Sequence, residues 1–165
     1  MFNIEIQRDV KVELHRFTDY FKGFEKVGAV RDLFGEDTEK VLHGLKVEFF
    51  SSRFGYMGVN PEDGHLMVST YYLKHGSERD IYLDIIHELN HIKQYMEGQE
   101  LFDERFEYAD RPTEIEAYKA AVSEAKRIEM TDDEIIEYLK TPWMSEKEHL
   151  KLASILGFTK ENTKH

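Results

Sequence analysis

Two histidines four residues apart, with a glutamate directly after the first, stand in the segment DIIHELNHIKQY, residues 84–95. A helix turns about 100° per residue, so His87 and His91 share one face and both imidazoles can reach a single metal ion. Glu88 stands beside that position, where a base could take a proton from metal-bound water. The pattern predicts a metal site, and Zn²⁺ is the expected ion.

A catalytic zinc usually has three protein ligands and a water, so a third ligand is needed. Glu114 and Glu116 at the start of the next helix differ by about 200° around its axis, and only one can face inward. Glu114 shares its face with small apolar residues and a tyrosine: Ala117, Tyr118, Ala121 and Ala125. Glu116 lies on a solvated stripe, and Thr113 with Glu116 resembles a capping box. We favour Glu114 as the ligand and keep Glu116 as the alternative.

Composition narrows the chemistry further. The chain has 165 residues, enough for a sizeable core, and we expect one domain over residues 1–165. It has no cysteine, which excludes thiolate metal sites and disulfides. The net charge is −11 and no basic face is visible, so we expect no nucleic-acid partner.

Hydropathy argues against a membrane protein. No apolar run reaches about 18 residues, and the first ten residues lack the basic and apolar regions of a signal peptide. We therefore expect no membrane insertion and a cytoplasmic location.

The elements that must position these residues indicate an α+β fold. In the first half, alternation predicts a strand over 2–6, and apolar spacing predicts a helix over 10–24. A short helix is expected around 36–45, followed by two or three strands in the segments 46–59 and 65–73, on either side of a turn at 60–64.

From Ser77 onward the pattern is helical. The metal-binding helix is expected to bury Ile81, Ile85, Leu89, Ile92 and Met96, and Gly98 ends it. A second long helix covers 111–130. Two capping boxes, Thr131 with Glu134 and Ser145 with Glu148, open short helices around a turn at Trp143, which we expect to anchor them.

The two motifs together resemble the gluzincin metallopeptidases. His-Glu-x-x-His in HELNH, followed by EIEAYKAA on a second helix, is most similar to M48-type peptidases, small soluble archaeal minigluzincins and ImmA/IrrE-like peptidases. The resemblance covers residues 79–125 and implies a zincin-like fold with an N-terminal helix and a small mixed sheet. It assigns the metal to His87, His91 and Glu114, and a peptide or protein as substrate.

The resemblance also implies features around the site. A strand before the catalytic helix should line the cleft and pair with substrate, and residues 65–73 stand in that place. In the relatives, an Asp or Asn side chain supports a zinc-binding histidine. Tyr118 stands at that position in this sequence, which is a departure from the family pattern. The relatives include small latent enzymes, so residues 131–165 are expected to be a C-terminal helical extension that could regulate the site.

Taken together, the residues predict zinc-dependent peptide-bond hydrolysis with Glu88 as general base. The negative charge that develops on the carbonyl oxygen needs a further donor, for which the candidates are Tyr118, Tyr95, His65, His75 and Arg111. Asp84, one turn before His87, could orient an imidazole. Two other interpretations remain open: a zinc-binding sensor or binding module without turnover, and a helical interaction protein with an accidental pentad.

Overall fold

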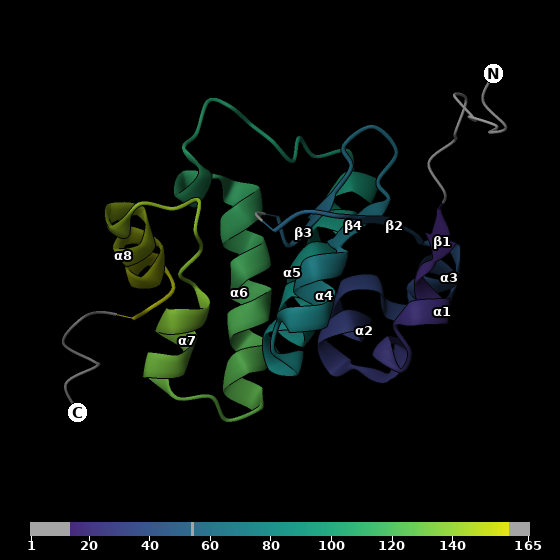
Figure 1. Ribbon diagram of the computed structural model, residues 1–165, viewed down its shortest axis with the longest axis horizontal. Helices are drawn as coiled ribbons and strands as arrows, with labels where there is room; N and C mark the ends of the chain where they lie inside the picture. The colour runs from purple at the N-terminus through teal and green to yellow at the C-terminus, as the bar shows by residue number, and fades with distance from the viewer. Residues whose placement is uncertain (1–13, 54, 159–165) are drawn as a thin grey trace, which may run out of the picture.

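The computed structural model describes residues 14–53 and 55–158 and has an α+β architecture, which confirms the predicted fold class. Figure 1 shows helices packed around a small sheet, with α5 and α6 side by side at the centre. The predicted strand at 2–6 lies outside the described residues. The helices are α1 Phe17–Tyr20, α2 Gly28–Phe34, α3 Thr38–Gly44, α4 Thr70–His75, α5 Glu78–Met96, α6 Pro112–Arg127, α7 Asp132–Tyr138 and α8 Glu146–Ile155. Short 3₁₀ turns are η1 Phe24–Lys26, η2 Gly35–Asp37 and η3 Tyr108–Asp110.

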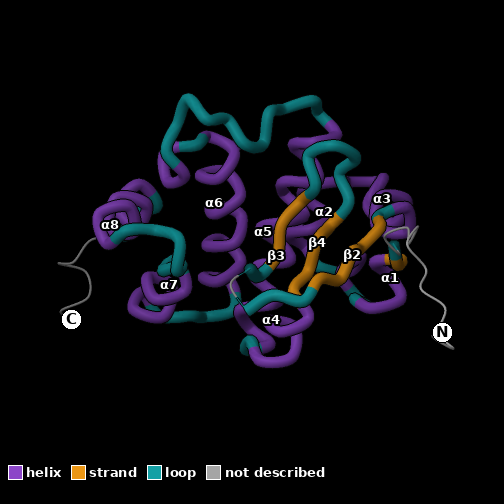
Figure 2. Tube along the Cα trace, turned by 45° about the horizontal axis from the view of Figure 1, so that its top comes forward, coloured by secondary structure: helices purple, strands orange, loops and turns teal. Residues whose placement is uncertain are grey.

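The described sheet is mixed and has the order β1-β2-β4-β3 (Figure 2). Its strands are β1 His15–Arg16, β2 Lys46–Phe50, β3 Met57–Val59 and β4 Leu66–Ser69. The central pair β2 and β4 is parallel, with Val47 opposite Leu66, and β1 and β3 join antiparallel on the outside. In the part of the chain that the structure describes, β3 is therefore an edge strand and β4 is an interior strand.

The strand predicted over 65–73 is wrong in its second half. The strand ends at Ser69, whose hydroxyl accepts a hydrogen bond from the backbone N–H of Tyr72 and so caps α4. A serine at this position favours a helix start, and that local bond outweighs the strand propensity of the two tyrosines that follow. The turn before β4 is as predicted. Gly64 adopts a φ of +76° there, and the Tyr95 ring occupies the space that a side chain would need, so both the backbone and the packing favour glycine.

The aromatic helix predicted over 10–24 is also wrong where the structure describes it. Only Phe17–Tyr20 is α-helical, since Phe21 is extended and Gly23 has a φ of +91°. Phe17 nevertheless stacks on Phe21 and meets Phe24 edge to face. The aromatic spacing thus marks a buried cluster, which a broken chain satisfies as well as a continuous helix.

The two long helices agree with the prediction. Ser77 caps α5 by accepting from the N–H of Asp80, and Gly98 follows the helix with a φ of +78°. Pro112 occupies the first turn of α6. Thr131 and Glu134 form the predicted capping box of α7, and Ser145 caps α8. None of the described helices is long and apolar enough to cross a membrane.

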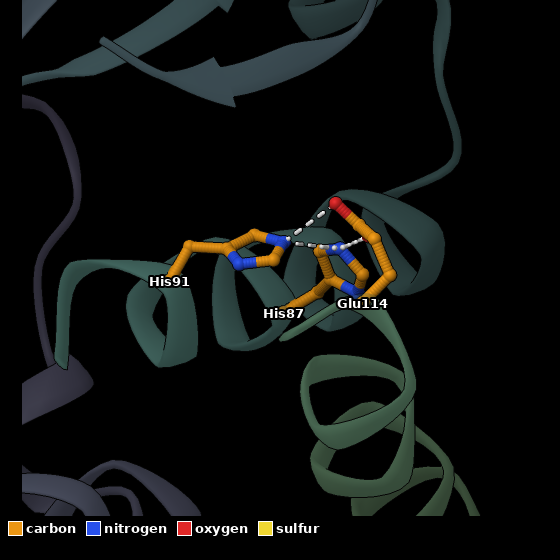
Figure 3. A group of neighbouring side chains, drawn as sticks. All are labelled: His87, His91 and Glu114. Carbon is orange, nitrogen blue, oxygen red and sulfur yellow. Dashed lines mark hydrogen bonds and ion pairs between the residues drawn. The ribbon is translucent and has the colours of Figure 1, made fainter. Parts of the chain in front are cut away.

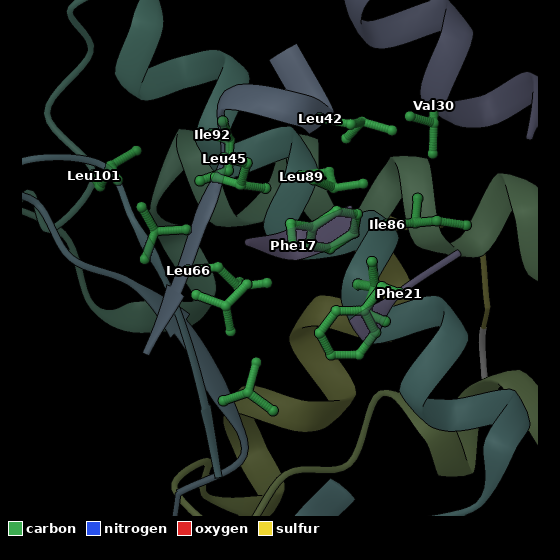
Figure 4. Packing of buried hydrophobic residues seen from close by; sticks show 14 residues of the cluster. Phe17, Phe21, Val30, Leu42, Leu45, Leu66, Ile86, Leu89, Ile92 and Leu101 are labelled. Carbon is green, nitrogen blue, oxygen red and sulfur yellow. The ribbon is translucent and has the colours of Figure 1, made fainter. Parts of the chain in front are cut away.

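Two hydrophobic clusters meet at α5. The first joins the sheet and the N-terminal helices to one side of α5 (Figure 4), with Phe17, Leu66, Ile86 and Leu89 among its fully buried members. The second joins α6, α7 and α8, and α5 contributes Leu83 to it. The predicted α5 stripe is buried or half-buried except Met96, which is 58% exposed because the helix ends there beyond the core. Packing on both sides fixes the helix that carries the histidines.

Candidate metal centre

The histidines of α5 point toward one another and toward the N-terminal turn of α6 (Figure 3). His87 and His91 are each 5% exposed, and their Nε2 atoms lie 3.1 Å apart. Because both rings are buried, their facing Nε2 atoms have lost the hydrogen bonds that they would make with water. Such an arrangement needs a compensating partner between or beside the rings.

Glu114 supplies that partner from α6. Its Oε2 lies 3.1 Å from Nε2 of His87, and its Oε1 lies 3.1 Å from Nε2 of His91. The side chain is buried. Ligand atoms held about 2 Å from a tetrahedral zinc lie about 3.3 Å from one another, and both contacts, which use different oxygens of Glu114, are close to this spacing. Among the described residues, His87, His91 and Glu114 are the group whose spacing suits a metal ion.

The helix phase separates the two glutamate candidates as predicted. Glu114 is buried with Ala117, Tyr118, Ala121 and Ala125, whereas Glu116 is exposed. The capping box proposed for Thr113 and Glu116 is wrong. Thr113 donates its hydroxyl proton to the carbonyl of Leu101, and the Glu116 carboxylate accepts from Gln94. Pro112 in the first turn sets the helix start two residues earlier, so Arg111 is the N-cap and Thr113 is already inside the helix.

Charge reinforces the triangle in the metal-free protein. Burial opposes protonation of His91, but its hydrogen bond to Glu114 and the charge of that carboxylate outweigh burial and raise its pKa to about 9. Burial favours the neutral form of Glu114, yet the hydrogen bonds from both histidines hold its pKa well below the usual range. Without metal, the site is therefore held by an imidazolium–carboxylate pair.

Metal binding should accordingly release a proton. Zinc takes a neutral imidazole, whereas His91 with its pKa of about 9 carries a proton at pH 7. We expect about one proton to leave per zinc bound at pH 7, and the apparent affinity to rise with pH until about 9. Calorimetric titration of the metal-free protein in buffers of different ionisation enthalpy measures this number. An uptake of protons, or an affinity that falls between pH 6 and 8, would contradict the assignment.

Glu88 lies next to the triangle without joining it. It is 8% exposed, and burial raises the pKa of its carboxyl group while the neighbouring histidines partly offset this. It lines the same cavity as the three candidate ligands. A carboxylate whose pKa moves toward neutrality has the proton affinity that a general base requires.

The candidate ligands open onto a cavity of about 750 Å³. One wall is the edge strand β3, with Met57, Gly58 and Val59. Residues of α7 and the segment after it, including Trp143, also line the cavity. The connection between α5 and α6 borders the cavity with Leu101, Phe102 and Tyr108. The strand that lines this cleft is thus β3 and not β4, the strand part of the predicted segment 65–73, because β4 lies inside the sheet between β2 and β3. From that segment, Tyr72 of α4 lines the cavity.

One supporting residue was missed from the sequence. Gln94 is fully buried one turn after His91, and its Oε1 accepts a 2.7 Å hydrogen bond from Nδ1 of that histidine. Its Nε2 donates to the carbonyl of Thr113, which ties α5 to the start of α6. A buried glutamine at the i+3 position of a histidine is the only local signal that could have revealed it.

Tyr118 does not replace the supporting carboxylate of the resembled family. Its ring packs 4.3 Å from the ring of His87, and its hydroxyl bonds to that of Tyr108 at 2.7 Å. Nδ1 of His87 is buried and has no hydrogen-bond partner among the described residues. The Tyr118 ring therefore holds the His87 imidazole by packing, where the resembled family would use a carboxylate hydrogen bond.

Of the five candidate oxyanion donors, only Tyr118 is among the residues that line the cavity. The others are engaged elsewhere: Tyr95 donates to the carbonyl of Glu62, His65 lies between Glu48 and Asp63, His75 packs on Tyr71, and Arg111 donates to the carbonyl of Asp103. Tyr118 is the one of the five that faces the predicted reaction site.

Asp84 does not have the role in orienting an imidazole that we considered. It accepts hydrogen bonds from the hydroxyls of Tyr72 and Tyr138, the latter at 2.7 Å. Burial raises its pKa, although both tyrosines favour the charged form. The aspartate therefore connects α4, α5 and α7 at the cavity wall and does not touch an imidazole.

Comparison with known proteins adds no assignment. No family model matches the chain. No curated protein matches it, and no solved structure does.

Proposed function

We propose that the chain is a zinc-dependent hydrolase of peptide bonds with a zincin-like, gluzincin-type arrangement of ligands. The observation that carries this proposal is the buried triangle of His87, His91 and Glu114, beside Glu88 and open to a cavity. A purely structural metal site would have four protein ligands and no access. Three protein ligands at a cavity wall leave a coordination position for a reactant.

The donor set suits zinc. Two imidazole nitrogens and one carboxylate match the ligands of known catalytic zinc sites, and a chain without cysteine has no thiolate alternative. When bound, the ion would supply a Lewis acid that polarises a carbonyl and acidifies water. Gln94 keeps His91 oriented because its Oε1 accepts a hydrogen bond from Nδ1–H of that histidine. This leaves Nε2 of His91 available as a metal ligand.

The remaining steps belong to the side chains. Glu88 would take the proton of the attacking water and return it to the leaving amine, and burial, which raises its pKa, favours uptake of the proton. The hydroxyl of Tyr118 or of its partner Tyr108 would donate to the carbonyl oxygen as negative charge develops there. The edge of β3 would pair with an extended peptide backbone, since that strand has a hydrogen-bonded neighbour on one side only among the described residues.

The direct test is proteolysis of an unfolded protein under metal control. Metal-free protein reloaded with one equivalent of zinc should cleave denatured casein, and treatment with a chelator should abolish cleavage. Readdition of zinc should restore it, since the ligands are side chains that survive metal removal. New amino termini are counted with fluorescamine. If the reloaded protein binds one zinc but cleaves no unfolded protein or peptide, the zinc-binding module without turnover replaces this proposal.

A further inference from the structure

A series of aromatic side chains in contact with one another lines the cavity. We define the aromatic collar as Tyr56, Tyr72, Tyr108, Tyr118 and Trp143, all of which line the cavity. Starting beside His87, the hydroxyls of Tyr118 and Tyr108 lie 2.7 Å apart. The ring of Tyr108 then meets Trp143 edge to face at 5.9 Å between centroids. These contacts lead away from the metal ligands, across the connection between α5 and α6, to the segment after α7.

The collar then returns to the same helix. The Trp143 ring lies 5.6 Å from that of Tyr56, which lies 4.6 Å from the ring of Tyr72. The hydroxyl of Tyr72 donates to Asp84 of α5, one turn before His87. These contacts thus join segments far apart in the sequence, and run from Tyr118 beside His87 to Asp84 one turn before it on α5.

Trp143 is not explained by packing. The sequence predicted that Trp143 anchors the C-terminal helices. That prediction is wrong, because its side chain is 47% exposed and its ring contacts are with Tyr56 and Tyr108 of the collar. The core of α7 and α8 is made instead by Ile135, Leu139 and Leu152. A half-exposed tryptophan at the wall of a cavity is a surface that a ligand can cover.

The charge of the cavity lining indicates that the ligand is a cation. Apart from Glu88 and Glu114, the cavity lining carries five carboxylates and two cations: Asp80, Asp84, Asp133, Glu134 and Glu137, against Arg79 and Lys140. Arg79 is paired with Glu134 at 2.5 Å. The side chains of Asp133 and Glu137, one turn apart on α7, have no hydrogen-bond or ion-pair partner among the described residues. Aromatic faces in a negative field attract cations, whereas neutral side chains would gain nothing from these carboxylates.

We propose that the aromatic collar binds the cationic side chain of a lysine or arginine in the peptide substrate, close to the bond that is cleaved. The inference rests on the proposed function, because it identifies the substrate class of the same site. The rings would contact the aliphatic stem and the charged head, and Asp133 and Glu137 would supply the long-range attraction.

Binding can be measured without turnover. Trp143 is the only tryptophan in the sequence, so intrinsic fluorescence reports on the collar directly. The zinc-loaded Glu88→Gln protein is titrated with acetyl-Ala-Ala-Lys-Ala-Ala-amide and with the norleucine peptide, which has nearly the same shape but no charge. We expect the lysine peptide to bind about tenfold more tightly at low salt. Equal affinities, or no binding of the lysine peptide, would overturn the inference.

A matched pair of double variants tests the carboxylates. Asp133→Asn with Glu137→Gln in the same background should reduce the preference for lysine over norleucine to about threefold or less. Asp32→Asn with Glu36→Gln removes the same charge from exposed residues four apart outside the cavity and should leave the preference unchanged. If both pairs reduce it equally, net charge and not the collar attracts the peptide, and the inference fails.

Cleavage separates this inference from the proposed function. With active protein, kcat/KM should be about tenfold higher for the lysine peptide than for the norleucine peptide. Cleavage of both peptides at the same rate contradicts the collar assignment and leaves the hydrolase intact. Tight, lysine-selective binding without any cleavage contradicts the hydrolase and supports the collar as a binding site.

Discussion

Replacement of Glu88 by glutamine is expected to abolish peptide cleavage while leaving one zinc bound per chain. The amide has nearly the shape of the carboxylate but cannot accept and return a proton, and the residue is not part of the His87–His91–Glu114 triangle. Loss of a general base lowers kcat by about 10²–10⁴-fold. The measurement is kcat on a fluorogenic peptide together with zinc per chain by elemental mass spectrometry.

The control for this variant is a glutamate on the same helix outside the site. Glu78 is exposed in the first turn of α5, so Glu78→Gln should retain both zinc and activity. If Glu88→Gln keeps more than about a tenth of the wild-type kcat, another group is the base and the proposed mechanism is wrong. If it loses zinc, Glu88 is needed to build the site, and its role as a proton carrier is unsupported.

The local part of the site was predictable because helix periodicity is a short-range property. The spacing of His87 and His91 places them on one face whatever surrounds the helix. The same reasoning placed Glu114 with the small residues of α6, and the structure brings it within 3.1 Å of both histidines. The sequence contains the phase of each helix, but the contact between them depends on tertiary packing.

Features that depend on chain topology were not predictable. The interior position of β4 follows from its parallel pairing with β2, a crossover that strand propensity does not encode. Asp84 receives Tyr138 from 54 residues away, and only the packing of α7 against the cavity creates that contact. Trp143 looked like a core anchor because tryptophan is usually buried, but here the C-terminal core is complete without it.

The errors in secondary structure have a common cause. In both Phe17–Phe24 and Thr70–His75, apolar or aromatic residues satisfied the expected pattern while a short-range backbone preference decided the conformation. Gly23 adopts a left-handed conformation, and Ser69 caps a helix. Pattern indicates which residues are buried, whereas turns and caps determine the path by which the chain buries them.

Replacement of Glu114 by alanine is expected to remove the zinc. Two histidines alone hold the ion weakly, and the third ligand of the triangle is the only one that α6 contributes. Ligand binding stabilises the folded state by about 3–4 kcal/mol when zinc exceeds its dissociation constant by 100- to 1,000-fold. For a chain of this size, that corresponds to a rise in Tm of about 10 °C. Wild type should show this rise on zinc addition, and Glu114→Ala should show almost none.

Comparison of the zinc-induced rise, and not of Tm itself, removes the ambiguity of a destabilised variant. Glu114→Ala also deprives His91 of the carboxylate that raises its pKa, so the metal-free variant need not match wild type. Glu116→Ala is the matched control, because it removes an exposed glutamate two residues away whose carboxylate has Gln94 as its one partner among the described residues. It should bind one zinc and keep the full rise in Tm. The reverse result would place the ligand on the solvated face of α6, which would require a rotation of that helix and would contradict the structure as well as the assignment.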